Sequence, residues 1–438
     1  MRPLFSTTER KTIMNSPINV SRKSTNTDDG LTKSDRPRWG AVFAMALCVA
    51  VLIASEFMPV SLLSPIAHDL GLTEGQAGQA IAISGIFAVL TSLFITVIAG
   101  RLDRRIVLIA FTGLMVLSGV VVALASNYAT LMAGRALLGV TIGGFWSMSA
   151  ATIMRLVPSE LVPRGLAIIY GGNALASAIA APLGSFIGGL VGWRWAFFSV
   201  VPVAVAALIW QALTLPRLPA ENDSDAKGML KLFRNRTVAL GMVAVMLSFM
   251  GQFALFTYLR PFLERLTGVN VSMLTWMLLI VGLTGLIGTS FVSRFLDGRL
   301  HTTLVVIPAV MAAVAIAMAV FGGSTWITAT LLALWGILST AAPIAWSTWL
   351  TRTLPNDAEA GGGLMVAIIQ LGITVGATVG GVLFDSLGGS VTFLSSAGIL
   401  TLSGLVAFAA KKLHVRQRAR PSFVIDQALT IDGGCTAC

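Results

Sequence analysis

Beyond residue 39, long apolar stretches alternate with short polar connections. Each stretch has about 20 residues, the length that an α-helix needs to cross a bilayer. Backbone groups in lipid must be hydrogen-bonded within their own segment, and the period-two alternation of a membrane barrel is absent, so the pattern predicts helices. The chain is therefore expected to be an all-α polytopic membrane protein. The twelve predicted transmembrane helices are 40–63, 78–99, 105–125, 129–154, 165–190, 194–215, 237–258, 272–293, 303–322, 325–350, 361–385 and 389–410.

Composition narrows the possible functions. The chain has 438 residues, of which 55% are hydrophobic and 11% charged, whereas soluble domains carry about 25% charged residues. This excludes a soluble enzyme, a disordered protein and a coiled coil. The sequence lacks a GK[ST] phosphate loop, HExxH and GxSxG. We expect no enzyme activity and no cofactor, and transport driven by a gradient. Cys435 and Cys438 lack further ligands, so no metal site is predicted.

The basic residues predict an orientation. Most of the 30 Lys and Arg residues lie in the two tails and in the connections on the same side as the tails. Arg194, Arg260 and Arg265 lie in connections on the other side. Because cytoplasmic connections collect Lys and Arg, both termini are predicted to be cytoplasmic, in a bacterial inner membrane. The net charge of +11 then needs no nucleic-acid partner, and the basic C-terminal tail is expected to contact anionic membrane lipids.

The longest polar connection separates two groups of six spans. The predicted divisions are a tail at 1–39, a six-helix bundle at 40–215, a central loop at 216–236, a second six-helix bundle at 237–410 and a tail at 411–438. Pro65 and Gly184 recur at one common spacing as Pro261 and Gly380, which favours two six-helix pseudo-repeats; chance matches in an apolar background are the alternative. Two similar halves around a central site are typical of an alternating-access carrier, here expected to be a monomer.

The connection after the second span reads GRLDRR and contains Gly100, Asp103, Arg104 and Arg105, and a weaker echo with Asp297 follows the eighth span. Glycine permits a tight turn, and aspartate can cap a helix or pair with arginine. The run resembles the loop signature of the major facilitator superfamily, which implies a latch between the cytoplasmic helix ends. The usual glycine before the second basic cluster is missing, and an ordinary basic turn is the alternative.

Two further runs carry the same resemblance. RALLG in the fourth span contains Arg135 and resembles the superfamily's RxxxG element. AAPLGSFIGG in the fifth span contains Pro182, Gly184 and Gly188. It resembles the proline–glycine signature of the drug:proton antiporter branch, with Ala181 where glycine is usual. Small residues let helices approach closely and proline removes a backbone hydrogen bond, so a generic packing face is the alternative.

The most specific resemblance lies in the run SEFMPVSLLSPIAHDLGLTEGQAGQ of the first span, together with GGFWSMSA in the fourth and GQFALFTYLRP in the seventh. These runs resemble bacterial exporters of sugars and nucleosides, and most closely the purine ribonucleoside efflux group. The resemblance implies proton-coupled export of purine ribonucleosides such as inosine and guanosine. A sugar (arabinose-type) or multidrug exporter is the first alternative, and a membrane receptor or scaffold that moves no solute is the second.

Glu56 and Arg135 are the candidate proton-coupling residues. Glu56 is the one acid clearly inside a predicted span, and Arg135 lies inside another. At 1.5 Å per residue, both lie about 10 Å below the outer face. Charge inside a span is costly and usually functional. We expect Glu56 to bind and release the coupling proton under the influence of Arg135. A static ion pair between the two is the alternative.

Aromatic and amide side chains near the middle of the membrane suit a planar heterocyclic substrate, because they offer flat apolar faces and edge hydrogen bonds. A packing role for each aromatic ring, and an interhelical hydrogen bond for each amide, are the alternatives. The candidate contacts to a small-molecule substrate, nucleoside or sugar-like, are Trp146, Asn173, Gln252, Phe256, Tyr258, Trp346 and Gln370.

Overall fold

The computed structural model describes residues 37–98, 102–219, 235–296, 298–354 and 358–418. Within these ranges the chain forms helices without strands, and twelve helices are long and apolar enough to cross a membrane. All twelve predicted spans fall on these helices, so that prediction is confirmed. They are α1 (Trp39–Leu70), α2 (Glu74–Ile98), α3 (Arg104–Ala123), α4 (Tyr128–Leu156), α5 (Val162–Val191), α6 (Trp193–Thr214), α8 (Arg236–Phe256), α10 (Val271–Leu296), α11 (Leu300–Phe321), α12 (Thr325–Thr353), α13 (Ala358–Leu387) and α14 (Gly389–Arg418).

Three short helical segments accompany the long helices. They are η1 (Ser159–Leu161), α9 (Leu259–Phe262) and η3 (Leu263–Thr267). Most of the predicted central loop and tails, with Cys435 and Cys438, lies outside the described residues. The domain boundaries stay a prediction, although α6 ends at Thr214 and α8 begins at Arg236.

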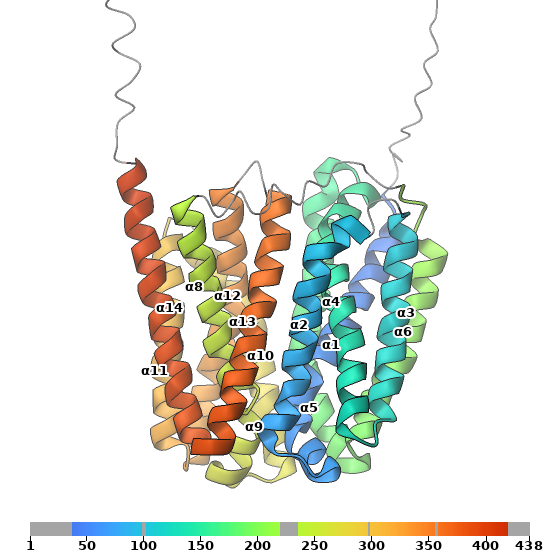
Figure 1. Cartoon of the computed structure of the whole chain (residues 1–438). Helices are drawn as coiled ribbons and strands as arrows, with labels where there is room; N and C mark the ends of the chain where they lie inside the picture. Colours follow the sequence, from blue (N-terminus) through green and yellow to red (C-terminus); the bar gives the residue numbers. More distant parts are fainter. Residues whose placement is uncertain (1–36, 99–101, 220–234, 297, 355–357, 419–438) are drawn as a thin grey trace, which may run out of the picture.

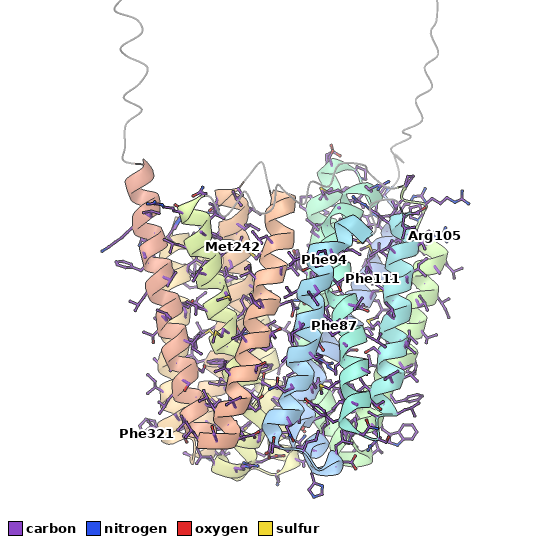
Figure 2. The ribbon with its side chains drawn as sticks, in the orientation of Figure 1. Phe87, Phe94, Arg105, Phe111, Met242 and Phe321 are labelled. Carbon is purple, nitrogen blue, oxygen red and sulfur yellow. The ribbon has the colours of Figure 1, made fainter. Side chains whose placement is uncertain are left out.

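The helices form two groups, α1–α6 and α8–α14, which stand side by side (Figure 1). Helix α1 begins and α14 ends at the same end of the bundle, which we call the terminal end (Figure 1). We call the opposite end the far end. Figure 2 shows Arg105 at the terminal end and Phe321 at the far end.

The buried apolar core is continuous between the two groups at the far end. One cluster of buried side chains includes residues 58–67 of α1, residues 77–82 of α2 and much of the second half. A separate cluster lies within the first half and includes residues 41–53 of α1. The halves are therefore packed against each other from the far end inward.

Two antiparallel helix pairs join the halves, α2 with α13 and α5 with α10. Asp385 of α13 accepts hydrogen bonds from the Thr73 hydroxyl at 2.6 Å and from the Gly75 backbone N–H at 2.9 Å. It thereby caps the N-terminus of α2 from the other half. Between α5 and α10, the Thr275 hydroxyl donates to the Ser185 hydroxyl at 3.0 Å. We call this set of contacts between the halves the far-end seam.

Candidate functional site

Glu56 lies near the middle of α1, and its side chain is directed at the other half of the molecule. It is 5% exposed. Its Oε1 atom accepts a hydrogen bond of 3.2 Å from Nε2 of Gln370 on α13. The other amide atom, Oε1 of Gln370, is buried and has no partner among the described residues. The predicted proton carrier therefore bridges the two halves, and the predicted substrate contact Gln370 is its partner.

Arg135 of α4 holds two neighbouring helices through their main chains. Its Nη1 and Nη2 atoms donate to the backbone oxygens of Ser55 at 2.7 Å and Glu56 at 3.3 Å. Its Nε atom donates to the backbone oxygen of Ala80 on α2 at 2.8 Å. In the described part of the chain the guanidinium and the Glu56 carboxylate form no ion pair, so Arg135 contacts α1 through its main chain.

A proline explains why Arg135 finds an acceptor inside a helix. In an α-helix each carbonyl accepts from the N–H four residues later, and Ser55 would use the N–H of residue 59. Residue 59 is a proline, which has no N–H. The carbonyl of Ser55 would be an unsatisfied acceptor in the membrane interior without the arginine. Arg135 and Pro59 therefore act together.

A second buried arginine repeats this arrangement across the halves. Pro65 lies four residues after Ser61 in α1 and leaves the Ser61 carbonyl without its helical donor. The Nη1 atom of Arg260, from α9 in the other half, donates to that carbonyl. Its Nε atom donates to Glu264 at 2.7 Å. The sequence places Arg260 in an outer connection, whereas the structure buries it in the far-end seam.

The predicted cytoplasmic latch lies within one half. Asp103 caps α3 by accepting from the backbone N–H of Arg105 at 2.8 Å, and it also accepts from the backbone N–H of Leu218 at 2.9 Å. The guanidinium of Arg105 donates to the backbone oxygen of Ala212 at 2.7 Å, and the backbone N–H of Arg104 donates to Leu218. These contacts tie the start of α3 to the end of α6. The remaining predicted members, Gly100 and Asp297, lie outside the described residues.

The predicted antiporter motif sits where α5 crosses two other helices. Gly184 and Gly188 lie against side chains of α1, and a Cβ atom at either position would force Ser61 or Leu62 to move. Pro182 removes the donor for the carbonyl of Ala178, and that oxygen lies against Gly282 of α10. The motif thus provides close approach to α1 in its own half and to α10 in the other half.

Trp146 and Asn173 lie beside an aromatic residue that the sequence reasoning missed. The rings of Trp146 on α4 and Tyr170 on α5 stack with centroids 6.0 Å apart and planes 27° apart. Tyr170 is 54% exposed, and Asn173 follows it on α5 by three residues. The available signal was its rarity, because the chain has 3 Tyr residues.

Gln252 and Phe256 of α8 lie beside an aromatic group that joins the halves. Phe57 of α1 lies 5.9 Å from Phe253 and 6.4 Å from Phe256, measured between ring centroids. Gln252 is 9% exposed, and its buried Oε1 atom has no partner among the described residues. Phe57 and Phe253 were missed because phenylalanine in an apolar span reads as ordinary packing.

Two predicted substrate contacts are packed into the protein core. Tyr258 is fully buried, donates its hydroxyl to the backbone oxygen of Ala377 at 2.7 Å and stacks on Phe384. Trp346 is buried and packs edge-to-face on Trp349 at 5.7 Å. In the described conformation both rings are covered by protein, so neither offers a face to a substrate.

Comparison with known proteins decides the family. The profile of the Major Facilitator Superfamily matches residues 45–362 and 261–431. The chain belongs to this superfamily. It is 53% identical over 372 residues to the transcription regulatory protein OpdE of Pseudomonas aeruginosa, covering 84% of this chain and 92% of OpdE. It is 43% identical over 378 residues to the purine ribonucleoside efflux pump NepI of Salmonella paratyphi B, covering 86% of this chain and 95% of NepI.

A solved structure shares the superfamily fold. The crystal structure of a D-xylose–proton symporter aligns with a TM-score of 0.69 at 16% identity, covering 84% of this chain and 97% of the symporter. Membership of the superfamily confirms that the chain is a multi-pass membrane transporter rather than an enzyme, with a small molecule as its substrate. Among the described residues, no group of three His, Cys, Asp or Glu side chains is placed to hold a metal ion.

Proposed function

We propose that this protein exports purine ribonucleosides, such as inosine and guanosine, in exchange for protons and with no other cofactor. The observation that carries the proposal is the hydrogen bond between Glu56 and Gln370, because it joins a buried titratable group on one half to the other half. The 43% identity to NepI supports the substrate class. Small-molecule export of this kind belongs in the bacterial inner membrane.

The orientation follows from the distribution of basic residues. The tails and the connections on their side carry most of the Lys and Arg residues, which supports a cytoplasmic position for the terminal end. The far-end seam then closes the outer side of the membrane. In the proposed cycle the described conformation is then the one that receives substrate from the cytoplasm.

The cycle uses the two protonation states of Glu56. Opening the far end separates α1 and α2 from α13 and breaks the Glu56–Gln370 bond, so Glu56 takes up a proton from outside once the nucleoside has left. A neutral carboxyl group is less costly to return through the membrane interior than a carboxylate. After the far end closes, the proton leaves to the cytoplasm, and Nε2 of Gln370 donates to the carboxylate. Protons move inward and nucleoside moves outward.

Inside-out vesicles test this proposal. In vesicles carrying the wild-type protein, an inward-acid pH gradient should drive accumulation of radiolabelled inosine. Glu56→Gln should abolish gradient-driven accumulation while leaving downhill exchange of inosine. Glu160→Gln, at a carboxylate near the terminal end in η1, is the matched control and should accumulate inosine like wild type.

Two results would contradict it. Accumulation that persists in Glu56→Gln would remove Glu56 as the proton carrier. Failure of excess inosine and guanosine to compete, with competition by arabinose or a lipophilic cation instead, would favour a sugar or multidrug exporter with the same coupling.

The second candidate is a membrane receptor that binds a solute and acts in regulation. It is favoured by the name of the 53% identical relative OpdE, a transcription regulatory protein. A receptor would bind inosine in detergent yet show neither accumulation nor downhill exchange in vesicles. The buried carboxyl group of Glu56 favours the exporter, because a protein that only binds has no need of a titratable group between its halves.

A further inference from the structure

Helix α5 has a lipid-facing side that can be read from its exposed apolar residues. Leu175, Ile179 and Leu183 are exposed at intervals of four residues, and Leu190 is exposed seven residues later. These intervals put all four on one side of the helix. An apolar stripe with this period on a membrane helix faces lipid. Tyr170 lies nine residues before Ile179, which is about two and a half turns of an α-helix. The ring of Tyr170 therefore leaves the opposite side of the helix, toward the interior of the bundle.

The interior side of α5 changes from covered to open along its length. Ala181 lies eleven residues after Tyr170, about three full turns, and so shares its side of the helix. Ala181 is 5% exposed, whereas Tyr170 is 54% exposed. The side is thus sealed near the far-end seam and accessible toward the terminal end. An exposed ring on an interior side faces open space inside the bundle rather than lipid.

The groups around Tyr170 have the chemistry to hold a planar heterocycle. One face of the ring stacks on Trp146 at 6.0 Å, and its exposure leaves the rest of the ring free. Asn173 lies one turn further along α5 and is partly buried. Neither the Tyr170 hydroxyl nor the Asn173 amide forms a hydrogen bond within the described part of the chain. A flat face with unused donors and acceptors beside it matches a nucleobase.

This aromatic group is distant from the proton carrier. Arg135 contacts the backbone at Glu56, and Trp146 lies eleven residues further along the same helix, about 16 Å at 1.5 Å per residue. A second route gives a similar value. Gly172, next to this group, lies against Ala46 of α1, and Glu56 is ten residues beyond Ala46, about 15 Å.

We propose that Tyr170, Trp146 and Asn173 form the subsite for the purine ring of the substrate, and that this subsite is separate from the proton site at Glu56. The proposal rests on the proposed function and deepens it. The purine ring stacks on Tyr170, and the Asn173 amide hydrogen-bonds to the polar edge of the purine. Substrate and proton then do not compete for the same atoms, and their exchange is linked through the movement of the two halves.

Equilibrium binding of radiolabelled inosine to the purified full-length protein tests the subsite. Tyr170→Ala should weaken inosine binding about tenfold or more, since base–aromatic stacking is worth about 1–3 kcal/mol, and Trp146→Ala should act in the same direction. Tyr170→Phe should bind within about threefold of wild type, because it keeps the ring. Phe186→Ala is the matched control: Phe186 is also 54% exposed and on α5, but on the lipid side.

The separation of the two sites is tested in the Glu56→Gln background. Effects at sites more than about 10 Å apart usually add, so Tyr170→Ala should weaken binding by the same factor there as in wild type. Tyr170→Ala protein that is folded and binds inosine like wild type would overturn the subsite while leaving the proposed function intact. Unequal factors in the two backgrounds would overturn the separation. Wild-type protein that binds no inosine would refute the proposed function and, with it, the subsite.

Discussion

Two buried arginines use the same chemistry for different ends. Arg135 and Arg260 each donate to a carbonyl of α1 that a proline four residues later has left without its helical donor. Arg135 belongs to the same half as α1, so its bonds persist while that half moves as a unit. Arg260 comes from the other half, so its bond must break whenever the far end opens. In the proposed cycle one motif therefore serves once as a permanent scaffold and once as a releasable joint.

The difference lies in the surroundings rather than in the residues. Arg135 makes bonds to two helices, α1 and α2, and fixes the segment that carries Glu56. Arg260 makes its one bond to α1 and is otherwise tied to Glu264, one turn along its own segment. Releasing Arg260 from Ser61 leaves the guanidinium paired with the Glu264 carboxylate, which lowers the free energy needed to open the far end.

Arg135→Met should have the largest effect. It leaves the Ser55 carbonyl unsatisfied inside the bundle and should lower the free energy of unfolding by about 3 kcal/mol. The thermal unfolding midpoint in detergent measures this. Adding Pro59→Ala should restore part of the loss, because it returns a backbone N–H to Ser55. Pro65→Ala is the control and should restore nothing. Equal rescue by both would show that the freed carbonyl is not the cause.

Arg260→Met should have a smaller effect on stability, about 1–2 kcal/mol, and a visible effect on opening. Thr378 of α13 lies beside Gln79 of α2 in the far-end seam. Thr378→Cys, in a protein whose native cysteines have been replaced, puts a single thiol at this position. A membrane-impermeant thiol reagent added outside should label it several times faster in Arg260→Met. Arg194→Met is the control, because Arg194 bonds Asp69 and Ala125 within one half. Unchanged labelling would refute the releasable joint.

Asp385→Asn should have the smallest effect. Asp385 caps α2 from the other half through Thr73 and Gly75, and an amide retains one acceptor but loses the charge that favours a helix N-terminus, worth about 0.5–1 kcal/mol. The same cysteine at Thr378 should be labelled about twice as fast. Labelling slower than in the parent would mean that the cap does not hold the far end closed.

Much of the fold was predictable because length and hydropathy determine it. Twelve apolar stretches long enough to cross a bilayer leave helices as the available structure. Glu56 and Arg135 were also found from sequence, because charge within a span is rare enough to signal a role. Pro59 even marks the Ser55 carbonyl as lacking a donor, but sequence does not say which side chain supplies one.

The rest of the site depends on which way each side chain leaves its helix. Sequence gives the depth of a residue in the membrane but not the direction it faces. Tyr258 and Trp346 have the depth of substrate contacts and are covered by protein, whereas Tyr170 was passed over and is open. Arg260 was placed outside because it follows a span, and a short helix, α9, turns it back into the seam.

The acceptors of Arg135, and the acceptor of Arg260 on α1, are peptide oxygens, which every residue type supplies. Relatives can exchange the side chains at positions 55, 61 and 80 without losing the bonds, so no compensating change is required at Arg135 or Arg260. Methods that infer proximity from correlated substitutions would miss both contacts. At positions 55 and 61 it is the proline four residues later that matters instead, because it leaves each of these two oxygens free for an arginine.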